Sequence, residues 1–427
     1  MQQQRIAASA VVLCLRTPPN IELGFDWRTF EVPEHFEGFK GVSPGIHFLY
    51  FSTSNVMRSG IFFEAASRQV IIFGWNSKEE FFQLVEIVDN TELWHQLQYN
   101  VHLAIIPPET DREWKRQSNY LTKDLLQNLN LSIFSHVQPG QVDELYGNLA
   151  NNGSVVPGYS LDNVRTPIFT PIPSERRANI HSTPEEITKF NMDATQRLES
   201  LLEHYNYLTN SCADVDYSDK HLSRGEYLLL GEQQVSFILF MLLFSLPGLE
   251  QWKKLTDLLC SCDDMLRTHA HLFSVFTRNL RFQLEAAPCD LFTDELSADN
   301  FLRGALEKLF DVADESTFLD APLKRNIEKL KNVVIANFGW CFREGKTFFS
   351  MNDSLEDEPT YVPYESCAIY LSDDSRVPPV GTSSTESLSK TMSRAVNEVR
   401  SLESSEFQFR KQSLQNALDS VNPDILP

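Results

Sequence analysis

Glycine is scarce in this sequence: only 17 of its 427 residues are glycine. Glycine-rich loops cradle phosphate groups because their backbone approaches the ligand closely, and no stretch here matches a P-loop or a dinucleotide-binding fingerprint. The sequence therefore gives no support to a nucleotide-dependent enzyme, and we predict no cofactor.

Long hydrophobic runs are also missing. The longest, residues 235–246, spans about 12 residues, whereas a helix that crosses a bilayer needs about 20. It predicts a buried helix, and we expect no contact with a membrane. Residues 6–15 resemble a short signal-peptide core, but Arg16 and two prolines follow where small cleavage-site residues belong. The β-branched residues of this stretch favour a first strand instead.

Cysteine usage indicates the compartment. The seven cysteines are an odd number and are scattered from Cys14 to Cys367. This distribution is typical of reduced thiols in an intracellular protein rather than of a disulfide framework. We expect the protein in the cytoplasm and the nucleus.

The charge balance is strongly acidic, with a formal net charge of −21 and a pI near 4.9. Nucleic acids and anionic lipids attract basic surfaces, so direct binding to either is not expected. Basic proteins are the favoured partners.

Hydrophobic residues make up 42% of the chain and aromatic residues 11%, enough for a sizeable core. At roughly 150 residues per domain the length predicts two to three domains. Short apolar runs separated by Ser, Gly, Asn and Pro predict an N-terminal β-rich domain over residues 1–138, built as a sandwich or barrel. A proline-rich interdomain linker is expected over 139–182, a helical domain over 183–345 and a flexible acidic tail over 346–427.

Helices are predicted from apolar residues at steps of three and four. Thr183-Pro184-Glu185-Glu186 has the capping-box pattern and should begin the helical domain. Residues 228–244 are apolar nearly all round and predict its central helix. The other predicted helices cover residues 91–100, 109–130, 249–269, 272–284, 301–310 and 322–338.

Ser43 lies in Gly41-Val42-Ser43-Pro44-Gly45, the spacing of a hydrolase nucleophile elbow. Such a serine needs an oxyanion hole that includes the N–H of the following residue, and Pro44 has none. The next residues predict a strand rather than a helix, so a turn is favoured over a catalytic site.

Two other groups of chemically active residues stand out in the sequence. Cys260, Cys262, His269 and His271 resemble four zinc ligands, but residues two apart on a helix point to different faces, so no metal site is predicted. The acidic run at 353–358 is best explained as a solvated tail, and it contains Ser354, a possible phosphorylation site.

An extended apolar segment follows this run at residues 360–371. It cannot satisfy its own backbone groups, so it either adds a strand to a sheet edge on a partner or returns to the protein's own β-domain. Both alternatives stay open on the sequence. The residues that would bind the partner are Tyr361, Val362, Tyr364, Ile369, Tyr370 and Leu371.

Several blocks resemble the Aar-two splicing-factor family. They are Gly24-Phe25-Asp26-Trp27, Phe36 to Gly41, Pro44 to Leu49, Thr183 to Thr188, Leu230-Gly231-Glu232-Gln233, Trp252 to Leu255 and Asp299 to Leu302. The resemblance covers roughly residues 10–345. It implies an α+β protein with an N-terminal β-rich sandwich-like domain, a linker and a C-terminal all-α helical domain that is similar to the VHS superhelix.

The resemblance also implies a function. Proteins of this family are assembly factors of the U5 small nuclear ribonucleoprotein that hold the scaffold protein Prp-eight through its RNase H-like and Jab/MPN-like domains. The implied mechanism is steric, because the chaperone excludes RNA and the Brr-two helicase until the particle matures. Residues 360–371 occupy the place of the family's partner-binding tail strand, and a monomer is expected when the protein is free.

Two other functions stay open as alternatives. One is a serine hydrolase that uses Ser43. The other is a helical adaptor for peptide motifs, which rests on fold analogy alone.

Overall fold

The computed structural model describes residues 9–19, 21–33, 35–52, 58–140, 164–173, 194–209, 219–288, 291, 301–315, 319–340 and 342. All of them belong to one compact unit. The predicted tail strand at 360–371, the Ser354 site and the Thr183 capping box lie outside the described residues, so these remain predictions. The boundaries predicted for the domains also remain predictions.

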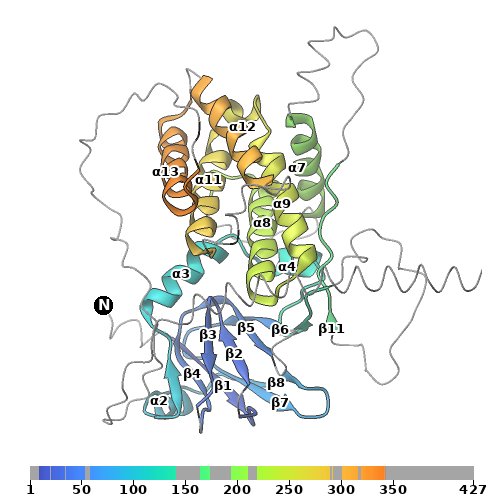
Figure 1. Cartoon of the computed structure of the whole chain (residues 1–427). Helices are drawn as coiled ribbons and strands as arrows, with labels where there is room; N and C mark the ends of the chain where they lie inside the picture. Colours follow the sequence, from blue (N-terminus) through green and yellow to red (C-terminus); the bar gives the residue numbers. More distant parts are fainter. Residues whose placement is uncertain are drawn as a thin grey trace, which may run out of the picture. The chain divides into compact units, whose positions relative to one another are not determined.

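The first sheet contains five strands in the order β8-β7-β1-β4-β9 (Figure 1). Strand β1 lies at its centre, antiparallel to β4 and parallel to β7. The strands are β1 (Ala10–Leu15), β4 (Gly38–Val42), β7 (Val70–Asn76), β8 (Phe81–Val88) and β9 (Leu103–Ile105).

The second sheet contains six strands in the order β11-β10-β6-β5-β2-β3. Its centre is the long antiparallel pair β5 and β6. The strands are β2 (Glu22–Phe25), β3 (Arg28–Glu31), β5 (Gly45–Ser52), β6 (Ser59–Ala65), β10 (His136–Val137) and β11 (Val164–Arg165).

One aromatic-rich core joins the two sheets. Phe39 and Phe73 of the first sheet pack in the same buried cluster as Phe25 and Phe63 of the second. Phe25 lies 4.7 Å from Phe39 and 5.9 Å from Phe63, measured between ring centroids. The prediction of an N-terminal sandwich-like β-region followed by a helical region is confirmed.

Helix α2 (Thr91–Gln98) covers the other face of the first sheet, where Trp94 packs on Val11, Val70 and Leu103. Asn90 caps its N-terminus by accepting two backbone N–H groups. The indole of Trp94 donates to the carbonyl of Ser9 at 2.8 Å. A helix was predicted here.

The single helix predicted over residues 109–130 is wrong. The chain forms α3 (Pro108–Ser118) and α4 (Lys123–Asn128), with a break between them. At the break, the buried N–H of Tyr120 donates to the side chain of Gln234 at 2.9 Å instead of to the preceding turn. Thr122 then caps α4. A partner more than 100 residues away therefore ends the first helix, and local periodicity does not reveal it.

The helical region surrounds α8 (Arg224–Leu243), which is buried along nearly its whole length. It is the one helix among the described residues that is long and apolar enough to cross a membrane, and here it lies inside the protein. Helices α7 and α9 pack against α8, and α11 packs against α13. The bounds are α7 (Thr195–Thr209), α9 (Leu246–Cys260), α10 (Met265–Thr268), α11 (Ala270–Ala286), α12 (Phe301–Glu315) and α13 (Ala321–Phe338).

The helix predicted over residues 249–269 is also interrupted. Helix α9 ends at Cys260 and the short α10 begins at Met265. Ser261 is engaged by two distant groups, since its carbonyl accepts from the N–H of Ala194 at 2.9 Å and its hydroxyl accepts from Lys308 at 3.2 Å. These tertiary contacts stabilise the end of the helix.

Part of the predicted linker is built into the fold. Residues 164–173, called the strap below, begin with β11, which pairs in parallel with β10. Asn130 donates to the carbonyl of Thr166 at 3.0 Å, and the N–H of Ile168 donates to the carbonyl of Leu129 at 3.0 Å. These contacts fix the strap to the region around β10 and α4.

His136 in β10 is a buried imidazole stacked between Phe81 and Phe51, at centroid distances of 4.7 and 5.9 Å. Neither ring nitrogen has a hydrogen-bond partner in the part of the chain that the structure describes. Burial without a partner disfavours the charged ring and lowers the pKa of His136 from 6.5 to about 4.

We expect His136 to make the protein acid-sensitive. Because the unfolded chain binds a proton near pH 6.5 and the folded chain only near pH 4, stability is lost as the pH falls between these values. Lowering the pH from 8 to 5 should cost about 2 kcal/mol through this residue. In urea unfolding at both pH values, His136→Phe should remove that part of the loss. The exposed His204→Phe serves as the control, and an equal pH response of both variants would contradict the assignment.

Candidate functional site

A small cavity lies where the connection between β4 and β5 meets α3. Its volume is about 190 Å³. It is lined by Ser43 to His47 on the sheet side and by Trp114, Lys115, Ser118, Asn119 and Leu121 on the helix side. It contains the one serine that the sequence suggested as a nucleophile, so its chemistry decides between a hydrolase and a structural role.

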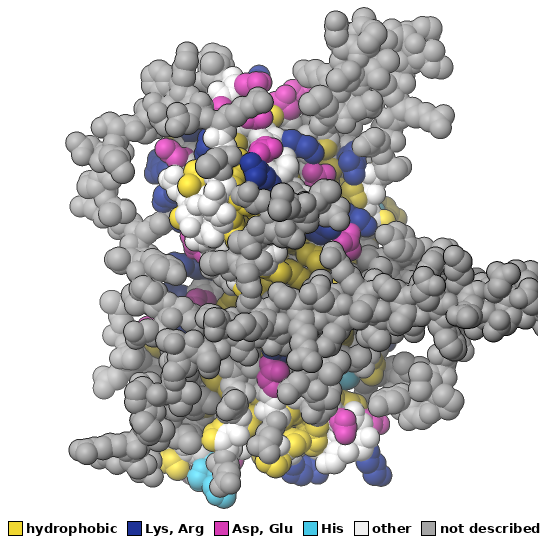
Figure 2. Space-filling view, in the orientation of Figure 1, with side chains coloured by type: hydrophobic (Ala, Val, Ile, Leu, Met, Phe, Trp, Pro, Cys, Tyr) yellow, Lys and Arg dark blue, Asp and Glu magenta, His cyan; other side chains and the backbone are white. Residues whose placement is uncertain are grey.

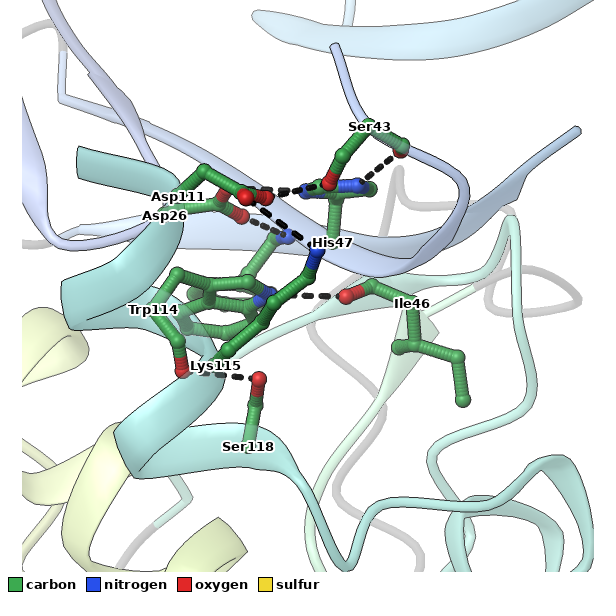
Figure 3. Close-up of polar contacts among 9 residues, drawn as sticks. Asp26, Ser43, Ile46, His47, Asp111, Trp114, Lys115 and Ser118 are labelled. Carbon is green, nitrogen blue, oxygen red and sulfur yellow. Dashed lines mark hydrogen bonds and ion pairs between the residues drawn. The ribbon is translucent and has the colours of Figure 1, made fainter. Parts of the chain in front are cut away.

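Ser43 does not have the geometry of a nucleophile. Its hydroxyl donates to Oδ1 of Asp111 and is nearly buried (Figure 3). Pro44 supplies no N–H for an oxyanion, and the following residues form strand β5 rather than a helix. The prediction of a turn that leads into a strand is confirmed.

His47 lies beside Ser43 but makes no hydrogen bond with its hydroxyl. Its Nε2 contacts the backbone carbonyl of Ser43 at 2.7 Å, and its Nδ1 contacts Oδ2 of Asp26 at 2.8 Å. The Ser43 carbonyl can only accept, so Nε2 donates to it. With Asp26 ionised, Nδ1 donates as well and the ring is an imidazolium, although burial raises the pKa of Asp26. Burial opposes this charge, but the Asp26 carboxylate and the two hydrogen bonds outweigh it and raise the pKa of His47. An imidazolium with both N–H groups engaged has no free lone pair with which to act as a general base.

The surrounding charges balance one another. Asp26 also accepts the N–H of Phe48 at 3.0 Å, and Asp111 pairs with Lys115 at 3.1 Å. Two carboxylates and two cations therefore lie in this cluster. Asp26 fixes the turn between β2 and β3 onto β5, and Asp111 fixes the connection between β4 and β5 onto α3 through Ser43. The cluster supports the fold rather than a reaction.

The same turn connects the sheets to the helical region. Trp27 stacks on Phe237 of α8 with an interplanar angle of 16°. On the other side of the cavity, the indole of Trp114 donates to the carbonyl of Ile46 at 2.7 Å. Arg58, next to β6, donates to the carbonyl of Leu242 near the end of α8.

A second polar cluster lies within α8 itself, at Gly231-Glu232-Gln233-Gln234. Gln234 accepts the N–H of Tyr120 and donates to Oδ1 of Asn119 at 2.7 Å. Gln233 exchanges two hydrogen bonds with Gln283 of α11, at 2.6 and 2.9 Å. The apolar central helix therefore carries a polar segment whose side chains each hold a different part of the molecule.

Glu232 is the charged member of this segment and is fully buried. Its carboxylate accepts the N–H and the hydroxyl of Thr170 at 2.8 and 2.7 Å, Tyr205 OH at 2.6 Å and Gln251 Nε2 at 2.9 Å. Burial raises the pKa of Glu232 even though these hydrogen bonds oppose the shift. One carboxylate therefore joins the strap, α7 and α9 to α8.

The remaining suggested ligands are not assembled. Cys260 and Cys262 are buried thiols that form no disulfide, and His271 contacts Asp219 at 2.9 Å. Within the described ranges, no group of three or more His, Cys, Asp and Glu side chains is placed to hold a metal ion.

The protein is an α+β protein with two regions, as the sequence motifs predict. Its β-sandwich region is joined to its helical region by buried side chains. Residues 8–130 match the model of the AAR2 N-terminal domain, and residues 169–343 match that of the AAR2 C-terminal repeat region. The chain belongs to the AAR2 family, which is the Aar-two family of the sequence motifs.

Relatives named "Protein AAR2 homolog" match most of the chain. The one from Caenorhabditis elegans is 28% identical over 342 residues, which cover 78% of this chain and 94% of the relative. The one from Homo sapiens is 27% identical over 363 residues, covering 78% and 90%. The one from Mus musculus is 26% identical over 372 residues, covering 80% and 92%.

The sequence did not predict that the residues of these two clusters contact one another. Asp26, His47 and Glu232 stand inside the quoted family blocks, but only as marks of resemblance. A signal was present, since an acidic or amide side chain within an apolar stretch requires a buried partner. The partners themselves, such as Asp111 and Thr170, lie too far away in the sequence to be identified from it.

Gly231 should be intolerant of any side chain. A Cβ there would lie 2.4 Å from the carbonyl oxygen of Tyr120, which is backbone and has little room to move. We expect Gly231→Ala to lower the free energy of unfolding by about 1–3 kcal/mol. Gly304→Ala on α12 is the matched control, because its Cβ would meet nothing within 4 Å. That variant should gain about 0.5–1 kcal/mol from helix propensity, and equal effects in urea unfolding would contradict the packing argument.

We expect neither the wild-type protein nor Ser43→Ala to have esterase activity. We expect hydrolysis of p-nitrophenyl acetate by the wild-type protein and by the variant to equal that of buffer. Unfolding should become easier by about 1–2 kcal/mol because Asp111 loses a buried donor. Ser118→Ala, in the same cavity, is the control. Turnover by the wild type and Ser118→Ala that is absent from Ser43→Ala would revive the hydrolase.

Proposed function

We propose that this protein is a non-enzymatic assembly chaperone of the U5 small nuclear ribonucleoprotein in pre-mRNA splicing. It binds the RNase H-like and Jab/MPN-like domains of the Prp-eight scaffold and blocks premature binding of RNA and of the Brr-two helicase. Membership of the AAR2 family supports a role in splicing-related assembly. The finer steps follow from the resemblance stated for the sequence.

The observation that carries the proposal is the joining of two different regions in one compact unit. Trp27 with Phe237 and Arg58 with the Leu242 carbonyl join the sheet region to α8, and Gln234 with Tyr120 joins α8 to the loop between α3 and α4. A steric chaperone has to present both regions in a fixed arrangement, because its effect depends on covering surfaces rather than on chemistry.

Charge supports a basic protein partner more than nucleic acid. The net charge of −21 repels phosphate and favours approach to basic surfaces. Figure 2 shows Lys and Arg intermixed with Asp and Glu over the described helices on that face, so the acidic balance is not gathered there in one patch. We therefore assign charge a role in the rate of association rather than in the choice of one face.

The same proposal includes the expected setting. The chaperone is present in the cytoplasm and the nucleus, leaves the scaffold when the particle matures, and is monomeric when free. The partner-binding strand at residues 360–371 stays part of this proposal.

The tail gives the sharpest test. We expect deletion of residues 360–427 to weaken binding to a purified Prp-eight fragment containing both domains by about tenfold or more, because the added strand is lost. Deletion of residues 372–427 keeps the predicted strand and should leave the affinity unchanged. Both affinities are measured by calorimetry, with the thermal midpoint as a check on folding.

Equal affinity of the two deletions would refute the tail strand. Failure of the full-length protein to bind the scaffold fragment would refute the partner itself. Competition by the full-length protein against RNA and Brr-two on the same fragment then tests the steric mechanism.

A further inference from the structure

The strap contains two Thr-Pro pairs, Thr166-Pro167 and Thr170-Pro171. Proline fixes the backbone dihedral φ and removes the N–H group, so these pairs limit the strap to an extended course with only two residues in a strand. An extended Ser/Thr-Pro pair is the local pattern that proline-directed protein kinases recognise. The question is whether a phosphate at either threonine would alter a contact.

Thr170 anchors the strap to α8. Its N–H and its hydroxyl both donate to the carboxylate of Glu232, at 2.8 and 2.7 Å, and its carbonyl accepts from Gln251 at 3.0 Å. Among the residues that the structure describes, this carboxylate accepts four hydrogen bonds, all from the neutral donors Thr170, Tyr205 and Gln251. The site therefore holds one negative charge, on Glu232, which faces the neutral hydroxyl of Thr170.

A phosphate on Thr170 would reverse this arrangement. It carries a charge of about −2 at pH 7 and replaces the hydroxyl hydrogen that Glu232 accepts. Two anions would then face each other in a buried setting where water screens little. Separation of the strap from α8 relieves both the repulsion and the desolvation of the phosphate.

We propose that Thr170 is a phosphorylation site for a proline-directed protein kinase, and that its phosphate releases the strap from α8. In this step the γ-phosphoryl group of ATP moves to Oγ1 of Thr170. The bond between the γ-phosphorus and the bridging oxygen breaks, a phosphate ester forms, ADP leaves and the hydroxyl proton passes to the base of the kinase. The inference concerns the coupling of the strap to the helices and does not rest on the proposed scaffold partner.

Access to Thr170 requires the strap to lift first. Its exposed fraction is 9%, so the kinase acts on a locally opened state. The strap suits such opening because β11 has two residues and Ile168, beside Pro167, is 63% exposed. Phosphorylation then traps the opened state, because the modified threonine no longer fits against Glu232.

Thr166 provides an internal comparison. It is half-buried, and the structure gives it a backbone contact, from Asn130 to its carbonyl. No contact of its hydroxyl with a carboxylate occurs among the described residues. A phosphate on Thr166 would therefore leave the anchor at Glu232 intact.

A cation of α7 next to the strap opposes release if it binds the phosphate. Arg197 of α7 donates through Nε to the carbonyl of Pro173 at 3.1 Å. If its guanidinium captured the phosphate, the strap would be held more tightly. The experiments must therefore distinguish release from tightening.

Charge variants test the repulsion without a kinase. Thr170→Gln and Thr170→Glu have side chains of nearly equal size and differ in charge. In the full-length protein we expect amide hydrogen exchange in residues 164–173 to be about tenfold or more faster for Thr170→Glu than for Thr170→Gln. Adding Glu232→Gln to Thr170→Glu should bring the exchange back toward that of Thr170→Gln. Equal exchange in the two single variants, or no recovery in the double variant, would overturn the electrostatic argument.

The modification itself is tested on the full-length protein with ATP and a purified proline-directed kinase. Mass spectrometry should locate phosphate on Thr170, and the phosphorylated protein should exchange faster in the strap than the unmodified one. Thr170→Val, which keeps Thr166, should lose this faster exchange under the same treatment. The inference fails if Thr170 stays unmodified in the native protein while the urea-unfolded chain is modified. It also fails if phosphate on Thr170 leaves exchange unchanged or slows it.

Discussion

The polar segment Gly231–Gln234 within the central helix is the constraint on which the rest of the structure depends. Helix α8 is buried along nearly its whole length, so every polar group that it carries must find a partner inside the protein. Glu232 is satisfied by the strap, α7 and α9, Gln233 by α11, and Gln234 by the loop between α3 and α4. These elements are therefore arranged so that the buried polar side chains of α8 all have hydrogen-bond partners.

The β-region is joined to this centre by side chains of one turn and its neighbours. Asp26 holds His47 and the backbone of Phe48, while Trp27 stacks on Phe237 of α8. The apparent Ser-His-Asp group at the cavity is therefore explained as an ionic clamp with a fully engaged imidazolium. Trp27, which stands in one of the blocks that resemble the family, is one of the residues that hold the two regions together.

Much of the fold follows from the sequence, and the exceptions have a common cause. Apolar periodicity predicted the strands between residues 10 and 105 and the helices α8, α11, α12 and α13, because burial alone determines them. It failed at the breaks after Ser118 and Cys260, where Gln234 and Ala194 from distant segments take over the backbone groups. The contacts of the candidate site could not be predicted for the same reason. Glu232 is recognisable as a polar residue in an apolar run, but nothing near it in the sequence indicates that Thr170 is its partner.

The central claim is that α8, through its polar segment and through its contacts with Trp27 and Arg58, makes the sheets and the helices one cooperative unit. Pulsed hydrogen exchange during urea unfolding tests it most directly, because peptides from β5 and from α11 report each region separately in the same sample. The account predicts one common unfolding midpoint for both sets of peptides. Two separate midpoints, with one region still folded while the other has exchanged, would contradict it.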